Sequence, residues 1–179
     1  TTLFRSVAAT ESFILADGDR VARAPQHEDS GGMTEDGPEL GEIEIYGAGD
    51  ELPTDQREDD ARSLVFLSDP LPAALQLLGG ALLRLTISTD TDDGQLAARL
   101  LDIAPDGTST RISYGLLNLL HHTGSDHASR LEPGTIVEVE LRLNDAGYEI
   151  PAGHRLALAV STAYWPLAVP VPTPVTATV

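Results

Sequence analysis

Residues 151–166 read PAGHRLALAVSTAYWP, and this stretch decides the fold. Its first three residues form a turn, because Pro and Gly favour tight reversals of the chain. The turn is followed by a predicted strand over residues 154–162. The strand leads to an aromatic pair, Tyr164 and Trp165. We interpret the stretch as one edge of a β-sandwich.

Short segments of the same kind follow one another from residue 63 onward. Pairs such as Gly79-Gly80, Asp93-Gly94 and Asn144-Asp145 separate them, and such pairs are typical of turns. This spacing predicts an all-β fold, an antiparallel β-sandwich of the jelly-roll kind. The seven predicted strands cover residues 63–68, 81–89, 95–103, 110–120, 135–143, 154–162 and 174–179.

Residues 135–143, TIVEVELRL, alternate most clearly between polar and apolar positions. Successive side chains of a strand point to opposite faces of its sheet, so the two sets are predicted to separate. The outer face then carries Ile136, Glu138, Glu140 and Arg142, and the core face carries Val137, Val139, Leu141 and Leu143.

Two apolar segments are ambiguous, because periodicity alone does not separate short strands from short helices. In residues 95–103, Leu96, Arg99 and Leu100 also fall on one helical face, but the flanking glycines favour a strand. Residues 71–78 suit a short helix after Pro70 as well as they suit a strand.

Residues 1–62 form an irregular, acidic N-terminal section of the same domain, followed by the sandwich at residues 63–179. Short strands are predicted at residues 12–16 and 42–46. Residues 24–38 are too polar to offset the entropy of ordering them, which predicts a long loop. Such a stretch is unusual in a compact domain, so the section is expected to lie against something larger.

The composition suits one globular domain of 179 residues and narrows its chemistry. Without cysteine, disulfides and thiolate metal sites are excluded. No signal peptide and no membrane-spanning segment is recognisable, so a cytoplasmic location is favoured. The net charge of −17 repels phosphates and anionic lipids, so neither nucleic acid nor a membrane surface is an expected partner.

We find no catalytic residues in the sequence. A serine hydrolase of the α/β type needs a Gly-x-Ser-x-Gly elbow, because that strained turn presents the nucleophile. Gly107-Thr108-Ser109 does not continue into such an elbow. No phosphate-binding loop occurs either, and the chain contains no lysine to complete one.

Two segments contain possible metal ligands, but we expect neither a metal nor another cofactor. His121, His122, Asp126 and His127 lie close in sequence and are interpreted as a polar hairpin loop. Residues 90–94 lack the full ligand spacing of a calcium loop and suit a solvated turn better.

Tyr164 and Trp165 are the candidate binding residues. They follow a predicted strand, where a sandwich presents its loops, and aromatic rings there could stack on a sugar or line a shared pocket. The alternative is that the pair closes the core beneath the proline-rich C-terminal residues.

Several short motifs follow one another in an order that resembles a known family. They resemble the C-terminal domain of the X-Pro dipeptidyl-peptidase and cocaine-esterase-like hydrolases, also called CocE/NonD-type hydrolases. The motifs are DQR at residues 55–57, DDARSLVF at 59–66, SDPL at 68–71, LLDIAPDG at 100–107, YGLLNL at 114–119, LEPG at 131–134, GHRL at 153–156 and YWP at 164–166.

The resemblance implies a galactose-binding-like jelly roll without catalytic residues. In that family the Ser-His-Asp triad lies in a separate α/β-hydrolase domain upstream, which would be the partner of this chain. The parent protein would be a serine hydrolase that cleaves peptides after an X-Pro pair, or acyl esters. This chain would pack on the hydrolase domain and help to shape the mouth of its substrate pocket.

Two other functions stay open at this point. A carbohydrate-binding module is possible by fold analogy and by the Tyr164-Trp165 pair. A protein-interaction domain is the other alternative, because a surface built to face a partner domain is apolar and favours self-association of an isolated chain.

Overall fold

The computed structural model describes most of the chain from residue 55 onward and three short segments before it. The described residues are 2–5, 10–13, 21–23, 55–124, 126–164, 167–168, 171–172 and 175–179. The predicted strand at residues 42–46, the predicted loop at 24–38 and the candidate binding residue Trp165 therefore lie outside the described residues.

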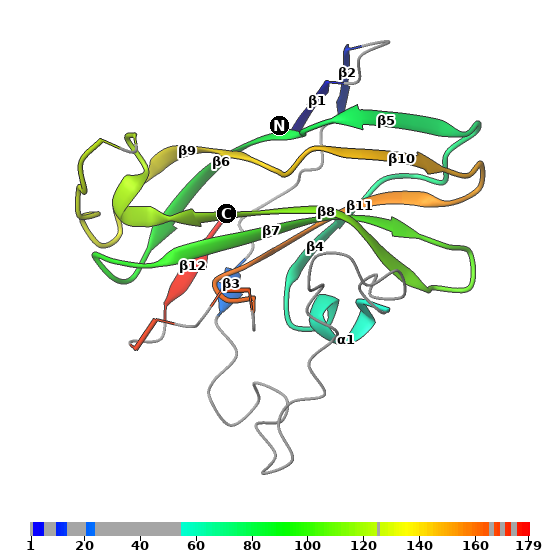
Figure 1. Ribbon diagram of the computed structural model, residues 1–179. Helices are drawn as coiled ribbons and strands as arrows, with labels where there is room; N and C mark the ends of the chain where they lie inside the picture. Colours follow the sequence, from blue (N-terminus) through cyan, green and yellow to red (C-terminus); the bar gives the residue numbers. More distant parts are fainter. Residues whose placement is uncertain are drawn as a thin grey trace.

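The described part of the chain is built from strands with two short helical turns (Figure 1). The helical turns are α1 (Arg57–Asp60) and the 3-10 turn η1 (Leu119–His121). The strands are β1 (Thr2–Arg5), β2 (Thr10–Phe13), β3 (Val21–Arg23), β4 (Leu64–Leu67), β5 (Leu75–Gly79), β6 (Leu82–Thr89), β7 (Gln95–Ile103), β8 (Ser109–Asn118), β9 (Val137–Arg142), β10 (Ala146–Ile150), β11 (Arg155–Ser161) and β12 (Thr176–Thr178).

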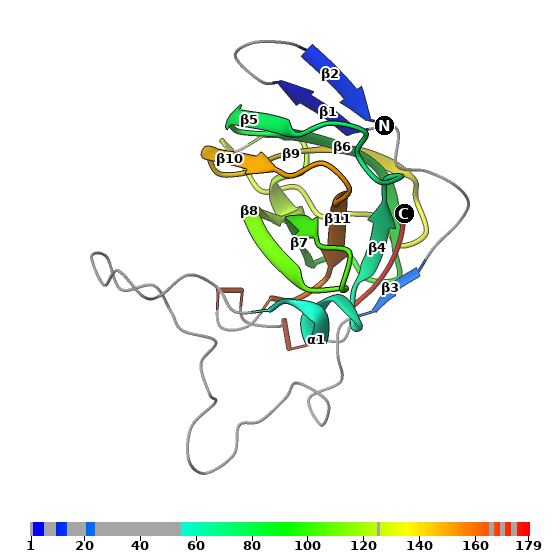
Figure 2. The same cartoon turned by 90° about the vertical axis from the view of Figure 1, so that its right-hand side faces the viewer.

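The strands form an antiparallel β-sandwich, as predicted. One layer is a four-stranded sheet in the order β4-β11-β7-β8. The other layer is a sheet in the order β2-β1-β6-β12-β3, in which β9 also pairs with β6, together with the two-stranded sheet β10-β5. Figure 2 shows the two layers one above the other. The jelly-roll order of connections and the galactose-binding-like assignment remain predictions.

Strands β5 and β6 follow one another with a kink between them, and so do β9 and β10. The two halves of this long antiparallel ladder pair as β6-β9 and β5-β10. Gly80 lies at the kink. A Cβ atom at this position would stand 2.6 Å from Oδ1 of Asp145 and 2.7 Å from the backbone oxygen of Leu143, so a larger residue does not fit without a shift. The turn signal at Asn144-Asp145 therefore marks a bend within a ladder.

The seven predicted strands are confirmed, with boundaries that differ by a few residues. Residues 95–103 form strand β7, which decides that ambiguity in favour of the strand. The alternative of a helix over residues 71–78 is wrong, because residues 75–79 form β5. The predicted strand at residues 12–16 overlaps β2, which ends at Phe13. Strand β10 was not predicted, because only three residues separate it from the end of β9 and they contain a turn signal.

The prediction that residues 154–162 form an edge is wrong. Strand β11 lies inside its sheet, between β4 and β7. Every residue from Leu156 to Ser161 is buried, so both faces of the strand are covered. The alternation of Leu with Ala in this stretch does not mark an exposed face. It places large side chains toward the core and small ones toward a second, closely covered face.

The core lies between the two sheets. Leu96, Ala98 and Leu100 of β7 point into it, as do Leu156 and Leu158 of β11. From the opposite layer, β9 contributes the predicted core face, with Val139 at 3% and Leu141 at 4% exposure, while Ile136, directly before the strand, is 72% exposed. The predicted separation of the two faces of this strand is confirmed.

Replacing a core leucine should destabilise the domain far more than replacing an exposed one. Leu158→Ala removes a side chain that is 2% exposed and should lower the free energy of unfolding by about 2–5 kcal/mol through lost burial and a residual cavity. Leu78→Ala is the matched control, because Leu78 is 57% exposed and should change it by less than about 1 kcal/mol. Urea unfolding of both variants measures the difference, and equal losses would contradict this core assignment.

Candidate functional site

The four-stranded sheet is covered on the face that points away from the sandwich core. Figure 2 shows α1 on this outer side, beyond β7 and β8. Ala97 and Leu101 of β7 and Ala157 and Ala159 of β11 belong to this face, and each is at most 1% exposed. Apart from Leu101, these side chains are small, so other segments of the chain can pack closely on the sheet.

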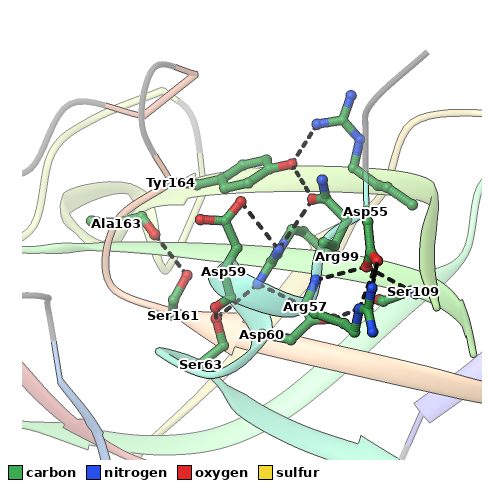
Figure 3. A network of polar contacts seen from close by, with 12 residues as sticks. Asp55, Arg57, Asp59, Asp60, Ser63, Arg99, Ser109, Ser161, Ala163 and Tyr164 are labelled. Atoms are coloured by element: carbon green, nitrogen blue, oxygen red, sulfur yellow. Dashed lines mark hydrogen bonds and ion pairs between the residues drawn. The ribbon is translucent and has the colours of Figure 1, made fainter. Parts of the chain in front are cut away.

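Arg99 stands at the centre of this outer face and is 1% exposed. It lies on β7 between alanines and leucines, so only polar groups from the covering layer can satisfy its guanidinium group. Its guanidinium donates to Oε1 of Gln56 at 3.1 Å and to Oγ of Ser63 at 2.8 Å (Figure 3). Both partners flank α1, so the buried arginine ties the α1 segment to the sheet.

Carboxylates of α1 balance the charge of Arg99. Asp60 approaches the guanidinium to 3.1 Å and Asp59 to 3.8 Å, and both contacts are ion pairs. Burial raises the pKa of Asp60, while the Ser109 hydroxyl and the Arg99 charge act in the opposite direction. Oγ of Ser109 donates to Oδ2 of Asp60 at 2.5 Å, which connects α1 to the start of β8.

The backbone completes this attachment. The amide of Gln56 donates to the carbonyl oxygen of Ser109 at 2.9 Å. In return, the amide of Ser109 donates to Oδ1 of Asp55 at 3.2 Å. The side chain of Arg57 donates to Asp55 and holds the pKa of that carboxyl below its usual value. Residues 55–60 are therefore held against the sheet by main-chain and side-chain contacts together.

Tyr164 packs over Arg99 from the segment that follows β11. The Arg99 guanidinium lies 4.9 Å from the centre of the Tyr164 ring, within the range of a cation–π contact. The Tyr164 hydroxyl donates to Oε1 of Gln56 at 2.9 Å and accepts from Arg111. Tyr114 meets the ring edge-on at 6.2 Å between ring centres. Tyr164 is 7% exposed, and burial raises its pKa.

A second polar cluster links the two layers of the sandwich. Asp102 of β7 is buried and accepts at 2.9 Å from the hydroxyl of Tyr148, which belongs to β10. Nδ1 of His154, in the turn before β11, lies 2.8 Å from the other carboxylate oxygen. Burial, then the hydrogen bond to Asp102, raises the pKa of Tyr148 to about 12. This cluster joins the end of one sheet to the kinked ladder of the other.

Within the described ranges, no group of three or more His, Cys, Asp or Glu side chains is arranged to hold a metal ion. The two sequence segments with possible ligands make other contacts. Asp90 accepts from the amide of Thr176, and Asp92 pairs with Arg130 at 2.7 Å. Nδ1 of His122 lies 2.8 Å from the backbone oxygen of Leu119. In the same ranges, no helix has the length and apolarity needed to cross a membrane.

Of the two candidate binding residues, the structure describes only Tyr164. Tyr164 is a buried member of the polar network, and Arg99 and Tyr114 take up its ring, so it presents little surface for stacking on a sugar. Trp165 lies outside the described residues. Sequence reasoning missed Arg99, Gln56 and Asp60. An arginine in the middle of the apolar strand LAARLL was the available signal, because such a charge requires buried partners.

The fold and this network define a class of protein, a β-sandwich domain whose buried polar residues fasten the α1 segment to the outer face of one sheet. A family model for the X-Pro dipeptidyl-peptidase C-terminal non-catalytic domain matches residues 6–179, and the chain belongs to this family. The resemblance drawn from the sequence motifs is therefore confirmed.

Individual relatives agree with this assignment. The chain is 27% identical over 131 residues to a cocaine esterase of Rhodococcus sp. (strain MB1 Bresler), an alignment that covers 72% of this chain and 23% of the esterase. This chain therefore spans about a quarter of the length of that relative.

Solved structures share the fold. An alpha-amino acid ester hydrolase matches 70% of this chain and 25% of its own, with a TM-score of 0.64 at 22% identity. An aminopeptidase from the marine sediment archaeon Thaumarchaeota archaeon matches 99% of this chain and 34% of its own, with a TM-score of 0.70 at 18% identity. In both, the matching fold is a minor part of a longer chain.

Removing Arg99 should destabilise the domain strongly. Arg99→Met keeps an apolar stem but leaves Asp60 without its cation, which should lower the free energy of unfolding by about 3–5 kcal/mol. Arg84→Met is the matched control, because the Arg84–Glu140 pair is exposed on the opposite layer and should contribute below about 1 kcal/mol. Denaturant unfolding of both variants tests this, and similar losses would refute a structural role for the buried ion pair.

Tyr148 should make the domain sensitive to alkaline pH. Its folded pKa of about 12 lies above the ordinary value of 10.0, so its contribution to stability is complete below pH 10 and is lost as the pH rises toward 12. In Tyr148→Phe this part of the loss of stability at alkaline pH should disappear, so the stability should depend less steeply on pH. Unfolding midpoints measured from pH 8 to 12 give the slope, and an unchanged slope in the variant would exclude this linkage.

Proposed function

We propose that this chain serves as the accessory domain of a longer serine hydrolase of the X-Pro dipeptidyl-peptidase or acyl esterase type, and that it packs on the α/β-hydrolase domain of that protein. The observation that carries the proposal is the family match over residues 6–179. In addition, the matching region makes up only about a quarter of the cocaine esterase and of the amino acid ester hydrolase. The remaining length of such proteins has room for a catalytic domain.

The attachment of residues 55–60 supports this role. Gln56 and Asp60 are fixed to the sheet through Arg99 and Ser109, so residues 55–60 form a rigid part of its outer face. A domain that packs on a catalytic partner benefits from a rigid surface, because a fixed geometry keeps the two parts in register. The same rigidity would let the domain help to shape the mouth of the substrate pocket.

The chemistry of the described residues fits a non-catalytic role. Ser109 is 1% exposed and donates its hydroxyl proton to Asp60, so it is not presented to a substrate. His154 and Asp102 are in contact, but their third partner is Tyr148, and the group links the two sheets. These polar residues hold elements of the fold together.

A comparison of this chain with a longer polypeptide that carries it tests the proposal. We expect the isolated chain to hydrolyse neither X-Pro p-nitroanilide peptides nor p-nitrophenyl esters, and to remain unlabelled by a fluorophosphonate probe for active serines. The longer polypeptide should show turnover, with the label upstream of the sandwich. Inhibitor-sensitive turnover by the isolated chain would overturn the proposal, as would a longer polypeptide without any hydrolase domain.

A further inference from the structure

We propose that a patch on the outer face of the four-stranded sheet, formed by Arg111, Tyr114, Leu116 and Leu167, is where the catalytic domain docks, and that Arg111 pairs there with an Asp or Glu carboxylate of that domain. We call this patch the Arg111 surface. The inference rests on the proposed function and extends it, because it selects one face of the sandwich and one kind of contact.

Arg111 is held in place without an acidic partner among the described residues. It lies on β8 opposite Leu101, whose side chain belongs to the outer face. Its guanidinium carbon stands 4.9 Å from the ring centre of Tyr114 and 5.6 Å from that of Tyr164. One of its nitrogens donates to the Tyr164 hydroxyl. A guanidinium has five donor hydrogens, so this fixed group retains donors suited to a carboxylate.

Within the described residues, other arginines of the chain pair with a carboxylate, unlike Arg111. Arg57 pairs with Asp55, Arg84 with Glu140, and Arg130 with Asp92. The chain has a net charge of −17, so acidic side chains are abundant. A half-buried arginine that is oriented by two aromatic rings, and that meets no carboxylate in the described part of an acidic protein, is suited to one supplied from outside.

Apolar side chains share the outer face of the sheet with this arginine. Tyr114 packs against the small cluster formed by Ala97, Tyr164 and Ala168. Leu116 lies opposite Ala97 on β8 and is 41% exposed, and Leu167, next to Ala168, is 37% exposed. Arginine and tyrosine are enriched at the centre of protein interfaces, and the exposed leucines add apolar area beside them.

The outer face of the opposite layer has a different character. On β6 and β9 it carries the exposed pair Arg84–Glu140, and Arg142 beside it pairs with Asp145. Charged groups that already have partners and stand in water gain little from a docking domain. The exposed Ile136 and Leu78 also occur on that layer, but they are not neighbours, because Ile136 precedes β9 and Leu78 belongs to β5, with the charged pairs between them. The Arg111 surface is therefore the favoured face.

A catalytic domain is a better occupant than a second copy of this chain. Two copies, each with a net charge of −17, repel one another at low salt. The relatives of this chain carry roughly three quarters of their length outside the matched region, and the family is defined as the non-catalytic part of such proteins. A domain in the same polypeptide is present at a high effective concentration, which favours a contact of moderate strength.

Arginine labelling tests the docking face directly. Phenylglyoxal modifies accessible guanidinium groups, and mass spectrometry reports the rate at each position. We expect Arg111 to react at least about tenfold more slowly in the longer polypeptide than in the isolated chain, since a paired and covered arginine is shielded. Arg84 is the internal control and should react at the same rate in both. Equal rates at Arg111 would overturn the inference.

A pair of variants guards against indirect effects. Leu116→Asp in the longer polypeptide should restore fast labelling of Arg111, because it places a charge within the apolar part of the contact. Ile136→Asp, the matched control on the opposite layer, should leave Arg111 protected. Both residues are exposed, so the isolated chain should keep its unfolding midpoint in each variant. Protection of Arg111 that persists in Leu116→Asp would contradict the docking site.

The outcomes separate this inference from the proposed function. If Arg84 becomes protected while Arg111 does not, the domains pack through the other layer, and the docking face is wrong while the proposed function stands. If no arginine changes and the two domains unfold independently, the packing itself is refuted. If labelling of Arg111 in the isolated chain slows as its concentration rises, the occupant is a second copy, which also overturns the inference.

Discussion

The need to satisfy one buried charge governs the arrangement of this domain. Arg99 lies in the middle of a strand that is covered on both faces, and a guanidinium there is tolerated only with polar partners in place. Those partners come from α1 and its flanking residues, and Tyr164 closes over them (Figure 3). One side chain therefore draws together segments more than 60 residues apart in the chain.

The arrangement turns a two-layer sandwich into a support for a third layer. Small residues on the outer face of β7 and β11 let α1, Tyr164 and Ala168 lie close to the sheet. The other layer carries paired charges on its outer face, as expected for a surface in water. A domain with one solvated face and one covered face, at whose margin Arg111 stands without an acidic partner in the described residues, suits an accessory role beside a catalytic domain.

The strands were predictable because their signals are local. Alternating side chains in residues 135–143 and turn pairs at near-regular spacing depend only on neighbouring residues, and the structure bears them out. The kink after β9 was not predictable in the same way. It depends on the close approach of Gly80 to Leu143 and Asp145, residues about 60 positions away. The position of β11 inside its sheet was also missed, because an apolar run does not reveal which strands pair beside it.

The sequence by itself determined the class of fold and, through the order of its motifs, the family. It also showed that the chain lacks a nucleophile elbow, which a local pattern can show. Only the tertiary structure showed which groups Tyr164, Arg99 and Arg111 contact. A tyrosine after a strand reads equally as a binding residue or as part of the interior, and the difference lies in contacts with Gln56 and Tyr114. Such contacts join residues distant in sequence, and only the folded chain brings them together.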